Sequence, residues 1–310
     1  MSFDLNILQD TANKRIQMID KQCGNLIEIH CKGGLMNRWV VHNEGQPLDL
    51  ILGNTDNDNF EMNGFRSGKM SPFSCRIDEG EYQLDHHTFK FNKFYLGAHA
   101  MHGLIYDAQF SILSTQVYSN YAQVILSFDY KGTDPGYPFP FNIQIQWTLY
   151  TEDLIVIKTT IVNKSNSVIP FMDGWHPYFT LGGQVDNYVL AFQSNAKLLM
   201  RDDMIPTGKM LQENSFEEGL KIGITHFDDC YLLNKMQNKI QLSNEGKSII
   251  VTPIYNYPYL QIYTPDDRKS IAIENLSGAP DCFNNKMGLH YLEPQELIYF
   301  ETSYQFKPKL

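Results

Sequence analysis

Apolar and polar residues alternate with a period of two along much of the chain. The clearest case is residues 142–149, Asn-Ile-Gln-Ile-Gln-Trp-Thr-Leu, in which the four apolar side chains would point the same way. Such alternation predicts a strand with one face in the core and the other toward water, as in an antiparallel sheet. Thr148 and the other polar residues of this stretch are therefore expected on the wet face.

Comparable apolar runs recur about every 8–12 residues with turn residues between them, and almost no helical period occurs. They predict strands near 26–31, 109–116, 122–130, 187–193, 248–252, 259–263, 270–274 and 297–305, and a hairpin that turns at Asp85-His86. Residues 7–20 are the exception, because their loosely spaced apolar side chains favour one or two helical turns. The pattern as a whole predicts an all-β fold, a large antiparallel β-sandwich.

Composition agrees with this fold and narrows the class of partner. The chain has 310 residues, of which 43% are hydrophobic and 13% aromatic, and it shows no linker, so we expect a single domain over residues 1–310. A net charge of −10 and a pI near 5.3 argue against a nucleic-acid surface and disfavour a polyphosphate substrate.

The cysteines and the ends of the chain bear on its location. The five cysteines are odd in number and lack CxxC or zinc spacing, which favours free thiols in a reducing compartment. The first residues lack the basic and apolar segments of a signal peptide, and no apolar run of about 18 residues occurs. We expect a soluble, cytoplasmic protein without membrane contacts, either a monomer or a homodimer.

Three stretches carry the candidate chemistry. In Gly-Trp-His-Pro-Tyr-Phe at 174–179, His176 precedes a proline and so favours extended geometry that lets its ring point out of a strand end. His102 lies in a His-Gly pair upstream, and Glu274 ends the apolar run 270–274. Partial burial of Glu274 would raise its pKa and make it a better base.

Each of these residues also has an ordinary structural explanation when it is taken alone. A single histidine in a β-rich chain is usually a satisfied structural residue, and a glutamate at a strand end can lie in water. Trp175 and Tyr178 can be core residues in a chain this rich in aromatics. Arg76 follows a proline-led turn, so we expect it at the rim of the sheet, pointing into a cleft.

Metal and cofactor motifs are weak or missing in the sequence. The His99-x-x-His102 spacing suits zinc on a helix, but Leu96-Gly97-Ala98 favours a loop and no third ligand is near. The polar stretch 54–64 lacks the glycine and closing glutamate of a calcium loop. No G-x-S-x-G, phosphate-loop or dinucleotide motif occurs. We therefore predict neither a metal nor a cofactor.

Several of these stretches together resemble one family. The motifs that carry the resemblance are Pro72–Ile77 with Gly80-x-Tyr82, Met101-His102-Gly103, Tyr137–Phe141, Asn163 and Pro170, Trp175-His176-Pro177-Tyr178-Phe179-x-Leu181, Phe227–Tyr231, Leu260–Pro265, Glu274, Pro280–Asn284 and Leu292–Glu296. In this order they resemble the aldose 1-epimerase (mutarotase) family over most of the chain. Cys75 stands where the family usually has Asn, and the first histidine motif is shortened, which is similar to a divergent bacterial branch.

The resemblance implies a galactose-mutarotase-like sandwich that interconverts the α and β anomers of a hexose without a cofactor. It implies that Glu274 acts as the base and His176 as the acid. His102, Arg76 and Asp228 would bind sugar hydroxyls, and Trp175 or Tyr178 would cover the apolar face of the sugar.

Three other functions remain open from the sequence. A hexose-6-phosphate mutarotase would need a cationic pocket, for which Arg66, Lys69 and Arg76 are candidates. A non-catalytic carbohydrate-binding sandwich would keep the aromatics and lose turnover. In a purely structural β-domain, Glu274 would serve neither catalysis nor sugar binding.

Overall fold

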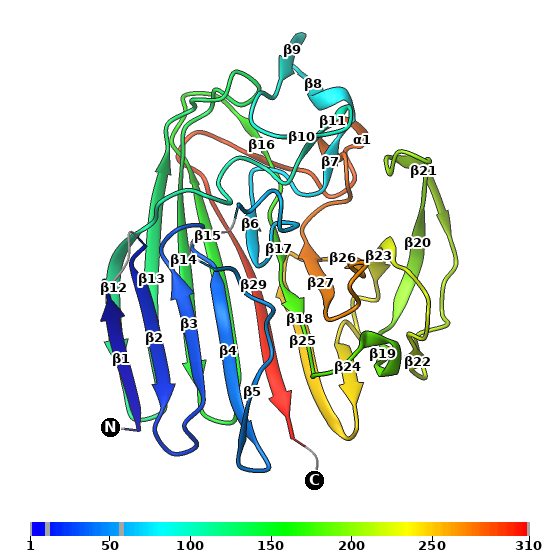
Figure 1. The fold of residues 1–310 in the computed structure, drawn as a ribbon. Helices are drawn as coiled ribbons and strands as arrows, with labels where there is room; N and C mark the ends of the chain where they lie inside the picture. The colour runs from blue at the N-terminus through cyan, green and yellow to red at the C-terminus, as the bar shows by residue number, and fades with distance from the viewer. Residues whose placement is uncertain (1, 10–12, 56–58, 309–310) are drawn as a thin grey trace.

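The computed structural model describes residues 2–9, 13–55 and 59–308 (Figure 1). Nearly all of the regular structure in these residues is β, and the strand pairings run antiparallel, as predicted. The largest sheet is nine-stranded. Its strands in spatial order are β12 (Ser111–Val117), β13 (Tyr121–Tyr130), β14 (Phe141–Tyr150), β15 (Leu154–Asn163), β29 (Leu297–Lys307), β25 (Lys247–Tyr255), β24 (Ile240–Asn244), β19 (Val189–Ala191) and β22 (Leu220–Lys221).

A second large sheet carries most of the candidate residues. Its strands in spatial order are β21 (Pro206–Leu211), β20 (Ser194–Met200), β23 (Asp228–Leu233), β26 (Tyr259–Tyr263), β27 (Ile271–Leu276), β17 (Gly174–His176) and β6 (Gly68–Met70), with β18 (Tyr178–Phe179) also paired to β27. The β20–β21 hairpin forms its outer edge, at the right of Figure 1.

The second large sheet forms one layer of the sandwich together with a five-stranded sheet built from the N-terminal residues. Its strands are β1 (Phe3–Leu8), β2 (Arg15–Asp20), β3 (Leu26–His30), β4 (Met36–Asn43) and β5 (Gln46–Asp49). A bridge between Ile51 and Phe179 joins it to the second sheet. The helical turns expected within residues 7–20 are wrong for 15–20, because Ile16 and Met18 alternate with half-buried neighbours along β2 and point into the core. Residues 10–12 of this stretch lie outside the described residues.

Short elements cover one end of the two layers, at the top of Figure 1. They are the three-stranded sheet β7 (Arg76–Ile77), β11 (His99–Met101) and β10 (Tyr95–Leu96), the hairpin β8 (Glu81–Leu84) and β9 (His87–Lys90), the pair β16 (Ile169–Phe171) and β28 (His290–Leu292), the 3₁₀ turn Asp78–Gly80, and helix α1 (Cys282–Asn285). A second 3₁₀ turn, Val185–Asn187, lies elsewhere, directly before β19. The predicted turn at Asp85-His86 is confirmed, since it joins β8 to β9.

The core lies between the two layers and is rich in aromatic contacts. The Trp147 ring of β14 lies 5.2 Å from the Trp175 ring of β17, and Tyr304 of β29 lies 5.1 Å from Phe179. The alternation predicted for 142–149 is confirmed, with one exception. Thr148 is buried, because Gln123 of the neighbouring strand covers it and donates a 3.1 Å hydrogen bond to its hydroxyl.

All five cysteines are free, and Cys23 alone is exposed. Among the described residues, no helix has the length and apolar character needed to cross a membrane.

Candidate active site

The floor of the candidate site is one face of the second sheet. Glu274 of β27 lies directly opposite Gln261 of β26, and Gln261 lies opposite Cys230 of β23. Directly paired residues point to the same face, as do residues two apart along a strand. Glu274, Gln261 and Asp228 therefore share one face, and the pairing of Gly174 with Leu276 places His176 on it as well.

The rim of the site is built by the short elements above the sheet. Arg76 begins β7, and His102 follows β11; the His102 N–H donates to the Cys75 carbonyl at 2.9 Å. Cys75 and His102 both have left-handed backbone, each with φ of 54°, which turns their side chains inward. A Cβ at Gly103 would lie 2.4 Å from the Ser71 carbonyl oxygen, so only glycine permits this close approach.

Floor and rim enclose a cavity of about 330 Å³, a size typical of small-molecule sites. Its polar lining consists of Glu61, Cys75, Arg76, His102, His176, Asp228, Gln261 and Glu274. Its other lining residues are Gly64, Phe65, Phe94, Leu96, Met101, Tyr178, Met200, Met204, Tyr263 and Pro280. Six of the seven residues proposed from the sequence thus meet in one cavity, although they come from distant parts of the chain.

Trp175 is the seventh, and its placement differs from the expectation. Adjacent strand residues point to opposite faces, so Trp175 faces away from the cavity that His176 lines. Trp175 is 2% exposed, and its ring contacts both the Trp147 ring and the Lys69 ammonium group, which lies 4.2 Å from the ring centroid. Trp175 is therefore a core residue.

His176 and Glu274 form the closest acid–base contact of the cavity. The His176 Nε2 atom lies 3.4 Å from Glu274 Oε1, and both residues are at most 4% exposed. The His176 ring stacks on Tyr178 with centroids 4.9 Å apart and an interplanar angle of 8°. His102 meets His176 edge to face at 5.0 Å. These ring contacts fix the direction in which the His176 imidazole points.

Burial shifts the pKa of each group in this cluster away from its ordinary value. It raises the pKa of the Glu274 carboxyl well above the usual range; the charge of Asp228 adds to the rise, and Arg76 opposes it. Burial lowers the pKa of His176 to about 3 and that of His102 well below its usual range. The carboxylate of Glu274 is therefore a stronger base than usual, and a protonated His176 is a stronger acid.

Some buried polar atoms at the cavity have no hydrogen-bond partner among the described residues. They include Glu274 Oε2, His102 Nδ1 and Gln261 Oε1. The Gln261 side-chain amide donates a hydrogen bond to Asp228 Oδ1, at 2.6 Å. Buried polar groups are normally paired, so orphaned atoms at a cavity mark where a polar ligand would bind.

Sequence reasoning did not assign Gln261 or Glu61 to the site. A usable signal existed for Gln261, because it is the one polar residue between Leu260 and Ile262 in a buried strand. No comparable signal marked Glu61, which reaches the cavity from a loop and accepts a hydrogen bond from the Tyr106 hydroxyl.

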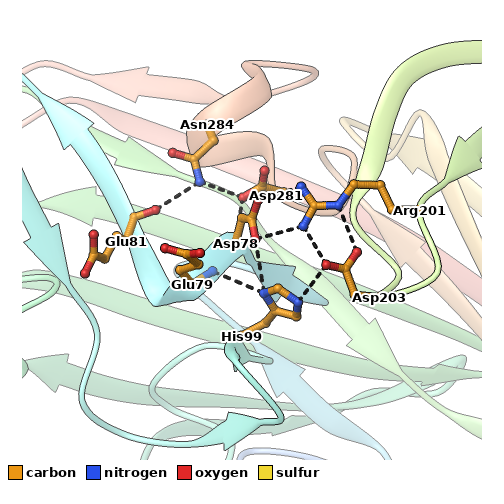
Figure 2. Close-up of polar contacts among 8 residues, drawn as sticks. All are labelled: Asp78, Glu79, Glu81, His99, Arg201, Asp203, Asp281 and Asn284. Carbon is orange, nitrogen blue, oxygen red and sulfur yellow. Dashed lines mark hydrogen bonds and ion pairs between the residues drawn. The ribbon is translucent and has the colours of Figure 1, made fainter.

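Possible metal ligands gather beside the cavity, outside it. Ligand atoms of Asp78, His99 and Asp203 lie within 4.8 Å of one another (Figure 2). Arg201 donates hydrogen bonds to both carboxylates, so a guanidinium already supplies the positive charge. His99 faces this cluster while His102 lines the cavity, so the two histidines do not share a site. Residues 56–58 of the polar stretch 54–64 lie outside the described residues.

The fold is a large antiparallel β-sandwich of the galactose mutarotase-like class. The aldose 1-epimerase family model matches residues 15–305. The chain therefore belongs to the aldose 1-epimerase family.

Solved structures with the same fold are remote in sequence. A galactose mutarotase-like protein from Clostridium acetobutylicum is 18% identical with a TM-score of 0.84, and the match covers 99% of this chain and 98% of that one. A galactose 1-epimerase from Lactobacillus acidophilus is 16% identical with a TM-score of 0.84, covering 99% of each. An aldose epimerase homologue from C. elegans is 16% identical with a TM-score of 0.83, covering 99% and 100%. No curated protein sequence gives a significant match.

Proposed function

We propose that this protein is a mutarotase that interconverts the α and β anomers of an uncharged hexose. The observation that carries the proposal is the contact between His176 Nε2 and Glu274 Oε1, at 3.4 Å, inside a cavity with orphaned polar atoms. The anomeric hydroxyl and the ring oxygen of a pyranose are bonded to the same carbon, so one base and one acid held this close can serve both.

The proposed reaction moves protons only and therefore requires no cofactor. Glu274 removes the proton of the anomeric hydroxyl as His176 gives its proton to the ring oxygen. The bond between C1 and the ring oxygen breaks, and C1 becomes an aldehyde. Rotation about the C1–C2 bond presents the other face of the aldehyde, and the reverse proton transfers close the ring. The pair thus holds one transferable proton before and after the reaction.

The pKa shifts suit these roles. A raised pKa makes Glu274 a stronger base, and a lowered pKa makes protonated His176 a stronger acid. Each such group typically contributes about 10²–10⁴-fold in rate. Burial disfavours the charged pair, so we propose that the pair rests in its neutral form and reacts in its charged form.

The rest of the cavity would hold the sugar by its far hydroxyls, since the C1–C2 bond must rotate. Arg76 donates, Asp228 accepts, and His102 can do either when neutral. Tyr178 stacks on His176 and offers an aromatic surface to the apolar face of the ring. Trp175 has no part in this proposal, because it lies in the core.

An uncharged sugar suits the cavity better than a hexose 6-phosphate. Of the three cations considered from the sequence, only Arg76 lines the cavity. Lys69 is fully buried and bound to Asp173. Glu61 and Asp228 bring carboxyl groups to the same cavity, and their negative charge would repel a phosphate dianion. We further propose that the protein works in the cytoplasm, where thiols such as the exposed Cys23 stay reduced.

The experiment follows freshly dissolved α-glucose and α-galactose by polarimetry, with and without the protein, and repeats the measurement with glucose 6-phosphate. We expect faster approach to equilibrium for at least one free sugar and abolition of that effect by Glu274→Gln. The matched control is Glu218→Gln, an exposed residue that does not line the cavity. Sugar binding without acceleration would instead support a carbohydrate-binding module.

A further inference from the structure

A polar cluster outside the cavity links the segments that form its walls (Figure 2). Asp78 is its centre. The Arg201 guanidinium donates to both oxygens of Asp78, at 2.9 and 3.1 Å, and also to both oxygens of Asp203, at 2.9 and 2.6 Å. Nδ1 of the buried His99 lies 3.3 Å from Asp78 Oδ1, and its Nε2 lies 3.5 Å from Asp203 Oδ2.

The backbone around Asp78 ties this cluster to a third segment. The Asp78 N–H donates to Asp281 Oδ1 at 3.0 Å, and the Asp281 N–H donates to the Arg76 carbonyl at 2.8 Å. Asn284 of α1 donates to Asp281 Oδ1 at 2.7 Å and to the Glu81 carbonyl at 2.9 Å. Each of these residues is therefore fixed relative to its neighbours in the cluster.

Every segment that meets at Asp78 carries a wall of the cavity a few residues away. Asp78 follows Arg76, His99 precedes His102, and Asp281 follows Pro280. Arg201 lies at the tip of the β20–β21 hairpin, between Met200 and Met204, which both line the cavity. The cluster is thus the point where the hairpin tip is held against the rest of the rim.

The hairpin depends on this attachment more than the other walls do. β21 is an edge strand with a largely exposed pattern, and β20 reaches the sheet by pairing with β23. A second hollow beside the cavity shares Arg76, Leu96 and Met204 with it, and Asp78, His99 and Arg201 line that hollow. Met204 therefore stands at the border between the two spaces.

We propose that Arg201 is a positioning residue that, through Asp78, holds Met200 and Met204 over the bound sugar and restricts the cavity to single sugars. This inference rests on the proposed mutarotase function. Without the Arg201–Asp78 pair, the hairpin tip would move away from Asp78, and the cavity would open toward the second hollow. A reducing disaccharide could then place its second sugar there.

The test compares KM and kcat for glucose and for maltose, whose reducing sugar is glucose. Arg201→Ala is expected to raise KM for glucose about three- to tenfold with kcat within about twofold, because the hairpin contacts ground state and transition state alike. The ratio of kcat/KM for maltose to that for glucose is expected to rise by a similar factor. Arg201→Lys keeps the charge but loses the paired donors, so its KM and its maltose-to-glucose ratio should fall between those of the wild type and those of Arg201→Ala.

Three further variants separate positioning from general loosening. Asp78→Asn should reproduce the effect of Arg201→Ala, and the double variant should be no worse than either, since both remove the same pair. Lys209→Ala is the matched control, because Lys209 is an exposed cation on the same hairpin. It should match the wild type.

Two results would overturn the inference: an unchanged KM in Arg201→Ala, or a parallel fall in kcat and thermal stability with an unchanged maltose-to-glucose ratio. A wild type that binds glucose without turning it over would contradict the proposed function alone. The ratio of dissociation constants for maltose and glucose would then test Arg201 in place of the kinetic ratio. A wild type that binds none of glucose, galactose and maltose would overturn both proposals.

Discussion

Two buried pairs of ionisable side chains lie on opposite faces of the second sheet, beside β17, and differ in how completely their atoms are paired. On the core face, Lys69 binds Asp173, whose carboxylate also accepts from the Ser71 and Tyr257 hydroxyls, each at 2.6 Å. On the cavity face, His176 contacts Glu274, whose second oxygen has no partner among the described residues. The first pair is complete within the protein, whereas the second requires a ligand to complete it.

The surroundings of the two pairs explain this difference. Burial lowers the pKa of Lys69 to about 8, Asp173 counters that shift, and the ammonium also lies over the Trp175 ring. Glu274 instead has Asp228 nearby, and the repulsion between them raises its pKa further. A satisfied pair stabilises one structure; a pair kept unsatisfied at a cavity is available for proton transfer.

The largest expected effect is on turnover, from the cavity-side pair. Glu274→Gln should lower kcat by about 10²–10⁴-fold, because it removes the base while keeping the shape of the side chain. Sugar affinity should change little. Polarimetry with α-glucose and α-galactose gives the rate, and titration calorimetry gives the affinity; retained turnover would remove Glu274 from the role of base.

The core-side pair should respond in stability. Lys69→Met leaves the Asp173 charge buried without its counter-ion, which typically costs about 3–5 kcal/mol. The double variant Lys69→Met, Asp173→Asn should recover part of this loss, because asparagine is neutral and its single amide oxygen still accepts from one of the two hydroxyls, Ser71 or Tyr257. Urea unfolding at neutral pH measures both, and a double variant no more stable than the single one would contradict the expectation.

The pH dependence of the two Glu274 states sharpens the comparison. Because the folded pKa of Glu274 is raised above its ordinary 4.5, its neutral form is the one that the fold favours. Wild type and Glu274→Gln should be equally stable below pH 4.5, and the wild type should become the less stable as pH rises toward the folded pKa. The difference should reach about 1.4 kcal/mol for each unit of the rise.

The raised pKa of Glu274 also governs the pH dependence of activity. Catalysis requires the pair to hold one proton, and the pair loses that proton as pH rises through the raised pKa of Glu274. The value of kcat/KM should therefore fall on alkalinisation, with a midpoint above pH 4.5. Asp228→Asn removes a neighbouring charge that raises the pKa of Glu274, so it should move that midpoint to lower pH. It should also raise KM by about tenfold, since it weakens a charged hydrogen-bond acceptor for the sugar. An unmoved midpoint would show that Asp228 does not act on Glu274.

The smallest expected effect concerns the two aromatics that flank His176. Trp175→Phe should leave KM within about twofold, because the ring lies in the core, while it lowers stability by about 1–3 kcal/mol. Replacing Tyr178 with leucine should instead raise KM, because Tyr178 lines the cavity. A large change in KM from Trp175→Phe would contradict the placement of its ring.

Most of the fold could be predicted because strand periodicity is a local property. Apolar and polar residues alternate cleanly in the run 142–149, and the strand β14 contains this whole run. The prediction of helical turns within residues 7–20 arose because Ile7, Leu8 and Ile19 obscure the strand-like alternation of Ile16 and Met18. Burial of Thr148 could not be foreseen either, since it depends on Gln123 in the neighbouring strand.

The site was predictable only in part. His102, His176 and Glu274 stand in short motifs that can be recognised from a single sequence. Asp78 and Arg201, in contrast, are joined by a contact across 123 positions, which no local pattern reveals. Trp175 could have been excluded at the start, because a residue next to His176 in the same strand must point to the other face.

The most direct test of the central claim is two-dimensional exchange NMR of equilibrated glucose and galactose, recorded with wild type and with Glu274→Gln at equal concentration. The claim predicts exchange cross-peaks between the α and β anomeric protons that appear with the wild type and vanish with the variant. Cross-peaks of equal intensity with both proteins, or none with the wild type for either sugar, would contradict it.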